Sequence, residues 1–380
     1  MRSDTLDADL AIPRPGTRIR PALPAVGLYL VFQLLAFGVL WLMSWKATVS
    51  PGRFVGAYDA NWFLSVADHW YTQPVTAGEV PHQNSLVFFP LYPAFIALLG
   101  LVGVPALPAA LTVTFLAGCA AAWGLYELGC DFAGPRVGTL LAVLWSITPG
   151  AVVLHMAYSE SLLVGLAAWT LVALGRRRWL LAGGLTVLAG LTRAGAGALV
   201  AAVCVAALVA VVRRRDGWRP WAGGLVAPLG LLGYLAYTAA RTGRLDGWFW
   251  LQRAWHMSFD FGRFTWSQVR EGLTANTSSW ITVTALLVIV AVGLQLWTWV
   301  TRMPFAWQIY GTATVLIALC SSDFFQARMR FLLPAFVLTV PIALVLAKFP
   351  NRVLAILLPV IAAVSAWYGA FLLAIVHLSP

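Results

Sequence analysis

The segment of the chain best suited to chemistry runs from Tyr58 to Tyr71, directly after the first long apolar stretch. It carries the carboxylates of Asp59 and Asp68 and the imidazole of His69. Charged groups this close to hydrocarbon are costly and are usually kept for function. Asp59 could act as a general base for a reacting hydroxyl, or it could cap a helix that begins at Ala60.

Asp68 follows Asp59 by nine residues, which returns it to about the same face of a helix at roughly 100° per residue. It could therefore share a site with Asp59, or it could belong to a solvated face. Trp62 is expected to bury one face of this segment at the membrane interface and to hold Asp59 at the height of the lipid headgroups.

An acid and three arginines lie at the ends of later apolar stretches. Glu160 opens one of them, where it could favour the positive end of a helix or face inward towards a polar ligand. Arg193 lies between two apolar stretches, and Arg328 and Arg330 begin another. A single arginine could extend to water, whereas two or three guanidiniums that meet at one point predict a phosphate site.

Composition indicates an integral membrane protein. Hydrophobic residues make up 61% of the 380 positions and charged residues 10%, with a mean hydropathy of +0.82. Soluble domains carry roughly 25% charged residues. The net charge of +11 is attributed to short arginine clusters between spans, which form no continuous stripe and do not indicate nucleic-acid binding. The scarcity of lysine and the abundance of Ala, Gly and Leu suggest a bacterial gene of high GC content.

The sequence shows none of the common cofactor motifs. The four cysteines form no C-x-x-C pair, and no zinc-protease, P-loop, nucleophile-elbow or dinucleotide motif occurs. A metal ion would require Asp59, Asp68 and Glu160 to converge, for which the sequence gives no evidence. No metal, nucleotide or other cofactor is therefore expected.

Apolar runs predict an all-α, polytopic protein with about 11 spans of roughly 20 residues each. The first run is expected to be retained as a signal-anchor, because no small-residue cleavage site follows it. The spans are expected at 25–45, 108–129, 137–152, 158–175, 179–192, 195–212, 218–240, 279–301, 303–320, 331–347 and 353–377.

Charge decides whether the apolar stretch 88–103 also crosses the membrane. If it does not, most of the short arginine clusters face the cytoplasm together with the basic tail 1–24, as the positive-inside rule requires. We therefore predict one transmembrane domain over 25–380, with interfacial helices in a first extracytoplasmic loop at 46–107 and a later loop at 241–278. The arginines of that later loop are the exception, and its tryptophans suggest that it lies on headgroups.

Five motifs resemble the PIG-V-like mannosyltransferases, which are related to GPI mannosyltransferase 2 and belong to the GT-C glycosyltransferases. They occur in order from the first loop to the penultimate span. They are Tyr58-Asp59-x-x-Trp62-Phe63, Phe88 to Pro93, Tyr158-Ser159-Glu160, Thr192-Arg193 and Arg330-Phe331-x-x-Pro334. Four positions depart from the usual family residues: Tyr58, Phe63, Trp70 (usually glycine) and Ala194.

This resemblance implies a GT-C bundle in the plasma membrane of a bacterium, with its active site outside the cytoplasm. The implied reaction transfers mannose, with inversion, from a polyprenyl-phosphate carrier to a hydroxyl of a lipid-linked or envelope glycan. Asp59 matches the family's presumed base, and Arg193 and Arg330 match arginines that could hold the carrier phosphate, with Arg328 nearby. The residues expected to contact substrate are Trp62, Asp68, His69, Tyr92, His155, Tyr158, Glu160 and Gln252.

Two other functions remain open on the sequence. A related transferase could use another polyprenyl-phosphate sugar, such as arabinofuranose or glucose. A glycolipid flippase would use the arginines to guide a headgroup, but it needs a polar path between leaflets, and the predicted spans are too apolar to supply one.

Overall fold

The computed structural model describes residues 22–46, 50–75 and 81–379, so nearly all of the expected basic tail 1–24 lies outside the described residues. The regular structure of these residues is helical. They contain an isolated antiparallel bridge between Phe259 and Ser321 but no β-strand. The expected all-α fold is confirmed.

Within the described residues, six helical segments are long and apolar enough to cross a bilayer. Three are single helices: α2 (Leu23–Lys46), α6 (Ala106–Ala133) and α15 (Ser279–Val300). The other three combine neighbouring elements: η3 (Ala194–Ala196) with α10 (Gly197–Val212), α11 (Arg219–Val226) with α12 (Leu229–Thr242), and α19 (Asn351–Phe371) with the π-turn η7 (Leu372–Val376).

Shorter helices occupy the remaining predicted spans. They are α7 (Pro135–Ser146), α8 (Glu160–Gly175), α9 (Trp179–Gly190), α16 (Phe305–Leu319) and a bent segment made of η5 (Phe325–Ala327), α17 (Arg328–Leu332), η6 (Phe336–Thr339) and α18 (Val340–Leu346). Every predicted span thus coincides with a helix or a group of helices, while the number that crosses a membrane stays a prediction.

The stretch 88–103 forms the short helix α5 (Leu91–Gly100). Ten residues rise only about 15 Å, half the thickness of a bilayer core. α5 packs beside α6, where the Tyr92 hydroxyl meets the Ala110 carbonyl and Thr114. Its length agrees with the prediction that this stretch does not cross.

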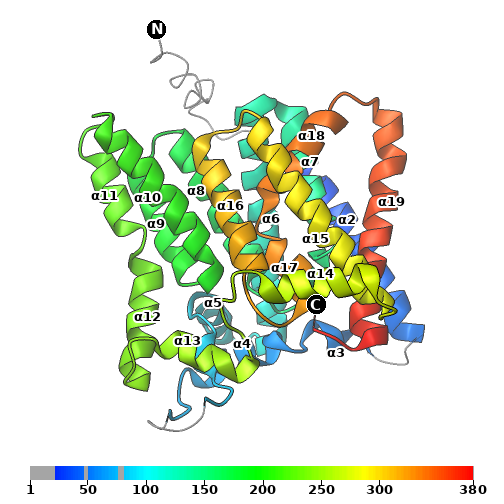
Figure 1. The fold of residues 1–380 in the computed structure, drawn as a ribbon, viewed down its shortest axis with the longest axis horizontal. Helices are drawn as coiled ribbons and strands as arrows, with labels where there is room; N and C mark the ends of the chain where they lie inside the picture. The colour runs from blue at the N-terminus through cyan, green and yellow to red at the C-terminus, as the bar shows by residue number, and fades with distance from the viewer. Residues whose placement is uncertain (1–21, 47–49, 76–80, 380) are drawn as a thin grey trace.

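The remaining helices lie mainly at the lower end of the bundle, where α3, α4, α13 and the C-terminus are found (Figure 1). They are α3 (Pro51–Val55), α4 (Asp59–His69), α13 (Gly247–Gln252), α14 (Arg263–Thr274), η1 (Ser85–Val87), η2 (Ala151–His155) and η4 (Arg253–Trp255).

Arginine-rich turns meet at the opposite end of the bundle. The Arg136 guanidinium, between α6 and α7, donates to the Phe349 carbonyl between α18 and α19. Between α8 and α9, Arg177 forms an ion pair of 3.2 Å with Asp216, which follows α10. Asp216 also accepts a hydrogen bond of 2.9 Å from the Trp179 indole. These contacts join four turns in two pairs, at the end of the bundle opposite α4.

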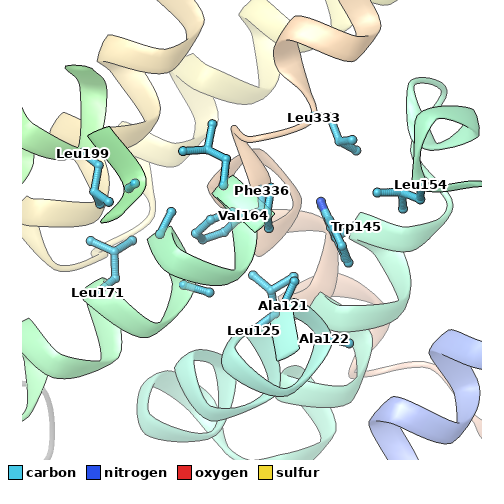
Figure 2. Packing of buried hydrophobic residues seen from close by; sticks show 14 of the residues in the cluster. Ala121, Ala122, Leu125, Trp145, Leu154, Val164, Leu171, Leu199, Leu333 and Phe336 are labelled. Atoms are coloured by element: carbon cyan, nitrogen blue, oxygen red, sulfur yellow. The ribbon is translucent and has the colours of Figure 1, made fainter. Parts of the chain in front are cut away.

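Small residues allow the central helices to pack closely. Alanines and glycines of α6 lie against α7 and α8, and larger side chains such as Trp145 and Phe336 fill the remaining space (Figure 2). Trp145 stacks on Tyr29 of α2 at 5.9 Å. Packing of this kind drives helix association where lipid is as apolar as the helices themselves.

A bend of 77° divides the expected span 331–347 between α17 and η6. Pro334 lies at the break and has no N–H to donate the next helical hydrogen bond. Its carbonyl accepts a hydrogen bond of 2.8 Å from Tyr310, so the broken backbone is satisfied inside the protein. The bend leaves the short helix α17, which carries Arg330, at the end of the bundle that contains α4.

α7 packs so closely on α6 at Gly138 that a larger side chain there should destabilise the protein. A methyl group on Gly138 would lie 2.4 Å from the Tyr126 carbonyl oxygen, whereas one on the exposed Gly184 of α9 would meet nothing within 4 Å. We expect Gly138→Ala to lower the free energy of unfolding by roughly 1–3 kcal/mol. Gly184→Ala should leave it unchanged or slightly higher. Thermal unfolding of the purified protein measures both, and equal midpoints would contradict the packing described.

Candidate functional site

The helix α4 begins at Asp59 and is bracketed by two residues in unusual backbone conformations. Tyr58 before it has φ 57°, and Trp70 after it has φ 52°. Non-glycine residues rarely adopt positive φ, and such strain concentrates at functional sites. The glycine usual in the resembled family at Trp70 fits this conformation without strain. Tyr58, and not Asp59, is the N-cap residue, so the Asp59 carboxylate is free of a capping role.

Asp59 instead binds an arginine from the other end of the chain. Its carboxylate accepts a hydrogen bond of 2.9 Å from Arg330 Nη1. The Arg330 Nε lies 3.6 Å from a carboxylate oxygen of Glu160, and that same oxygen contacts Arg193 Nη1. Four residues from four distant segments thus form one chain of ion pairs, which we call the acid–arginine cluster.

Burial differs along the acid–arginine cluster. The side chains of Glu160 and Arg330 are 1% and 7% exposed, whereas those of Arg193 and Asp59 are 24% and 30% exposed. Glu160 is therefore the buried centre that holds both guanidiniums, and Asp59 and Arg193 are its accessible ends. The two acids offset the two arginines, which makes burial of these charges tolerable.

Aromatic rings enclose the Arg330 guanidinium. Its Cζ lies 5.2 Å from the centre of the Tyr158 ring and 5.0 Å from that of Phe331, within the range of cation–π attraction. The Tyr158 ring is itself buried, with 1% of the residue exposed. It therefore limits where the Arg330 guanidinium can lie.

A cavity of about 740 Å³ opens in front of the acid–arginine cluster. Asp59, Arg193 and Arg330 line it and are the charged side chains among its described lining residues, while Glu160 lies behind them. One wall is aromatic and amide-bearing, with Asn61, Trp62, Gln83, Phe88, Trp248, Gln252 and Trp255. A second part of the lining, from α8, η3 and α16, is mostly aliphatic, with Leu163, Ala194, Gly195, Thr314, Ile317 and Ala318.

Several predicted site residues lie outside this cavity. Asp68 and His69 are exposed towards the end of α4. Tyr92 is buried between α5 and α6. His155 lies in η2 with its ring 6.0 Å from that of Phe37. None of these four residues appears in the cavity lining, whereas Trp62 and Gln252 do.

Arg328 also lies apart from the acid–arginine cluster. It is fully buried and donates hydrogen bonds to the Thr265 hydroxyl, at 3.2 Å, and to the Ser321 carbonyl. It thereby ties α17 to α14 and to the end of α16. Residues two apart on a helix point in different directions, so Arg328 binds Thr265 and Ser321 while Arg330 binds Asp59 and Glu160.

Sequence reasoning assigned the tryptophans of the loop 241–278 to headgroups, and the structure changes that interpretation. Trp250 is buried, and Trp248 and Trp255 line the cavity, whereas Trp266 is 70% exposed. Gln83 and Ser379 also line the cavity and were not singled out. The clustering of tryptophans near Gln252 was the signal available, but spacing alone did not show which ones point inward.

The acids of the site do not gather into a three-ligand group. Asp59 and Glu160 both bind Arg330, and Asp68 is exposed outside the cavity. Across the part of the chain that the structure describes, no three His, Cys, Asp or Glu side chains lie together in a way that could hold a metal ion.

Comparisons with solved structures identify the fold. The chain is similar to the crystal structure of ArnT from Cupriavidus metallidurans bound to undecaprenyl phosphate, with a TM-score of 0.54 and 14% identity. It is also similar to the apo state of that protein, with a TM-score of 0.52 and 15% identity. Each alignment covers 87% of this chain and 62% of the ArnT chain.

The chain therefore spans less than two thirds of the length of the structures it matches. No family model and no curated protein matches it. The comparison shows an ArnT-like fold, which agrees with the expected all-α membrane bundle.

The placement of His155 predicts an acid-sensitive step in stability. Burial lowers the pKa of this imidazole from 6.5 to about 4. The folded protein thus keeps His155 neutral, and its contribution to stability is complete above pH 6.5 and is lost as pH falls towards 4. We expect His155→Gln to reduce the loss of stability over this window, as measured by thermal unfolding against pH. His69→Gln, at an exposed site, is the control, and identical profiles for the two variants would contradict the assignment.

Proposed function

We propose that this protein is a membrane glycosyltransferase of the PIG-V-like type. It transfers mannose from a polyprenyl-phosphate donor to a hydroxyl of a lipid-linked or envelope glycan acceptor, with inversion, on the extracytoplasmic side of the bacterial plasma membrane. The observation that carries the proposal is the acid–arginine cluster, which lines a cavity at one end of an ArnT-like bundle. One of the two matched ArnT structures is bound to undecaprenyl phosphate.

Arg193 and Arg330 are suited to hold the donor phosphate. Both line the cavity and both approach one oxygen of Glu160, so their guanidiniums are already close together. Guanidiniums bind phosphate oxygens in a planar, bidentate manner. In the reaction they would offset the charge that develops on the departing polyprenyl phosphate.

Asp59 is suited to act as the base. It is accessible in the cavity and hydrogen-bonded to Arg330. When a phosphate binds Arg330, the Asp59 carboxylate gains a competitor for that guanidinium and can turn to an acceptor hydroxyl. The hydroxyl oxygen then bonds to the anomeric carbon as the bond to the phosphate oxygen breaks, and Asp59 takes the proton.

Mannose is proposed from the motifs. Members of all five motifs line the cavity: Asp59, Phe88, Ser159, Arg193 and Arg330. Glu160, next to Ser159, lies behind them and binds both arginines. This convergence of five sequence-distant motifs supports the PIG-V-like assignment over an unrelated membrane protein with the same bundle.

The side of the membrane is proposed from charge. The arginine-rich turns that bind Phe349 and Asp216 lie at the end of the bundle opposite α4. Positive loops favour the cytoplasm. The cavity and its acid–arginine cluster would then face outward, where the donor sugar is carried on lipid.

Removal of the base should abolish transfer without unfolding the protein. We expect Asp59→Asn to reduce transfer roughly 100-fold to 10,000-fold, because positioned proton transfer typically contributes that much. Asp68→Asn, which alters an exposed carboxylate on the same helix, should keep most of the activity. The assay supplies polyprenyl-phosphate mannose with a radiolabelled sugar to purified protein and membrane acceptors. Wild-type rates for Asp59→Asn would refute the assignment of the base.

The same assay tests the donor sugar. Mannose, glucose and arabinofuranose donors on the same polyprenyl phosphate are compared at equal concentration. We expect transfer from the mannose donor to be fastest. Faster transfer from either of the other two would keep the reaction class and refute mannose.

Loss of one guanidinium should weaken binding of the donor. We expect Arg193→Gln to raise the KM for the polyprenyl-phosphate sugar roughly tenfold to 100-fold, the worth of a hydrogen bond to a charged group. Arg270→Gln is the matched control, because Arg270 is exposed on α14 and does not line the cavity. An unchanged KM for Arg193→Gln, measured with the short-chain donor farnesyl-phosphate mannose, would show that this arginine does not hold the phosphate.

A further inference from the structure

Three rings of the aromatic wall, those of Trp62, Phe88 and Trp255, pack together into one platform. Trp62 stacks on Phe88 with ring centres 5.7 Å apart and planes 9° apart. Trp255 packs edge-on against both rings, at 5.7 Å from Trp62 and 6.2 Å from Phe88. Trp62, Phe88 and Trp255 are each partly exposed, so they are packed on one side and open to the cavity on the other.

Hydrogen bonds fix the backbone that carries this platform. The Phe88 carbonyl accepts hydrogen bonds from the hydroxyls of Tyr71, at 2.7 Å, and Tyr234, at 2.8 Å. The Trp248 indole donates to the Val87 carbonyl at 3.2 Å. These hydrogen bonds hold the backbone of Phe88 in place, and the rings of Trp62 and Trp255 pack on the Phe88 ring, so a ligand that binds there meets a surface that is already ordered.

The polar groups on this wall are neutral. Asn61, Gln83 and Gln252 present amides, which both donate and accept hydrogen bonds. The charged side chains of the described lining are Asp59, Arg193 and Arg330, which pair with one another or with Glu160. An anionic or cationic group against Trp255 would therefore have no counter-ion among the described residues of this wall.

The position of the wall distinguishes its ligand from the donor lipid. Trp62 lies three residues after Asp59 on α4, so the platform begins beside the proposed base. The aliphatic wall comes from α8, η3 and α16, inside the bundle, and suits an isoprenoid chain. In an inverting displacement the acceptor hydroxyl approaches on the face opposite the departing phosphate, which places the acceptor on the Asp59 side of the arginines.

We propose that the platform of Trp62, Phe88 and Trp255, with Gln252, is the acceptor subsite, and that the acceptor group bound there is an uncharged saccharide ring. This inference rests on the proposed function. The C–H face of a sugar ring packs on the indole of Trp255, and its hydroxyls bond to the amides. Rigid aromatic rings beside neutral amides favour such a ligand over a charged headgroup.

The test measures saccharide binding separately from transfer. The full chain, in nanodiscs, is mixed with methyl α-D-mannopyranoside or methyl α-D-glucopyranoside, or with the corresponding methyl uronates, which differ by a carboxylate. Saturation-transfer NMR reports which ring protons contact the protein. We expect the neutral glycosides to bind through their C–H protons and the uronates to bind at least threefold more weakly, because nothing on the wall balances their charge.

Variants of the platform give the second readout. Trp255→Ala should weaken binding of the neutral glycoside roughly threefold to tenfold, the worth of an aromatic packing contact. Trp255→Phe should restore most of it. Trp266→Ala, which removes an exposed tryptophan outside the cavity, should change nothing. If Trp255→Ala does not fold, Gln252→Leu removes the amide and should also weaken binding.

Failure of this inference is distinct from failure of the proposed function. Equal binding of uronates and neutral glycosides, or binding unaffected by Trp255→Ala and Gln252→Leu, would overturn the neutral saccharide subsite even if mannose transfer is observed. In the transfer assay, Trp255→Ala and Gln252→Leu should raise the KM for the acceptor and leave the KM for the donor unchanged, while Trp255→Phe should stay close to the wild type in both. A rise in the donor KM alone would assign the platform to the donor and refute the inference. Absence of transfer from any polyprenyl-phosphate sugar would refute the function while leaving the binding result intact.

Discussion

The burial of Glu160 between two arginines is the constraint on which the site depends. A carboxylate with 1% of its side chain exposed is tolerable only with cationic partners, and Arg193 and Arg330 are those partners. Arg330 in turn reaches Asp59. The three connections bring together the start of α4, the start of α8, the turn before α10 and α17, which no local sequence preference would place side by side.

Other features of the fold serve this arrangement. The break at Pro334 leaves α17 short and nearly perpendicular to the segment that follows it, so Arg330 is presented at the end of the bundle. Arg328, two residues earlier, anchors α17 through Thr265 and Ser321. The ring of Tyr158 limits where the Arg330 guanidinium can lie. Because the cluster is neutral as a whole, a bound phosphate would add negative charge next to Asp59 and change which group that carboxylate faces.

The sequence predicted the helices well, because spans of apolar residues are set by bilayer thickness and every predicted span coincides with helical segments. It also singled out all four members of the acid–arginine cluster. It could not separate Arg328 from Arg330, since both are buried and only the helical rotation between them decides their partners. Nor could it show that Asp68 and His69 are exposed beyond the cavity, although Asp68 shares the helical periodicity of Asp59. The aromatic wall was predicted only in part, through Trp62 and Gln252, because its members come from three segments and their convergence depends on hydrogen bonds from distant side chains to the backbone of Val87 and Phe88.

A structure of the full chain with a polyprenyl phosphate bound tests the central claim most directly. The account predicts that the phosphate oxygens lie within hydrogen-bond distance of both Arg193 and Arg330, with the isoprenoid chain along the aliphatic wall and Asp59 on the side of Trp62. A phosphate that binds instead among the arginine-rich turns at the opposite end of the bundle, with the Asp59–Arg330 pair unchanged, would contradict it.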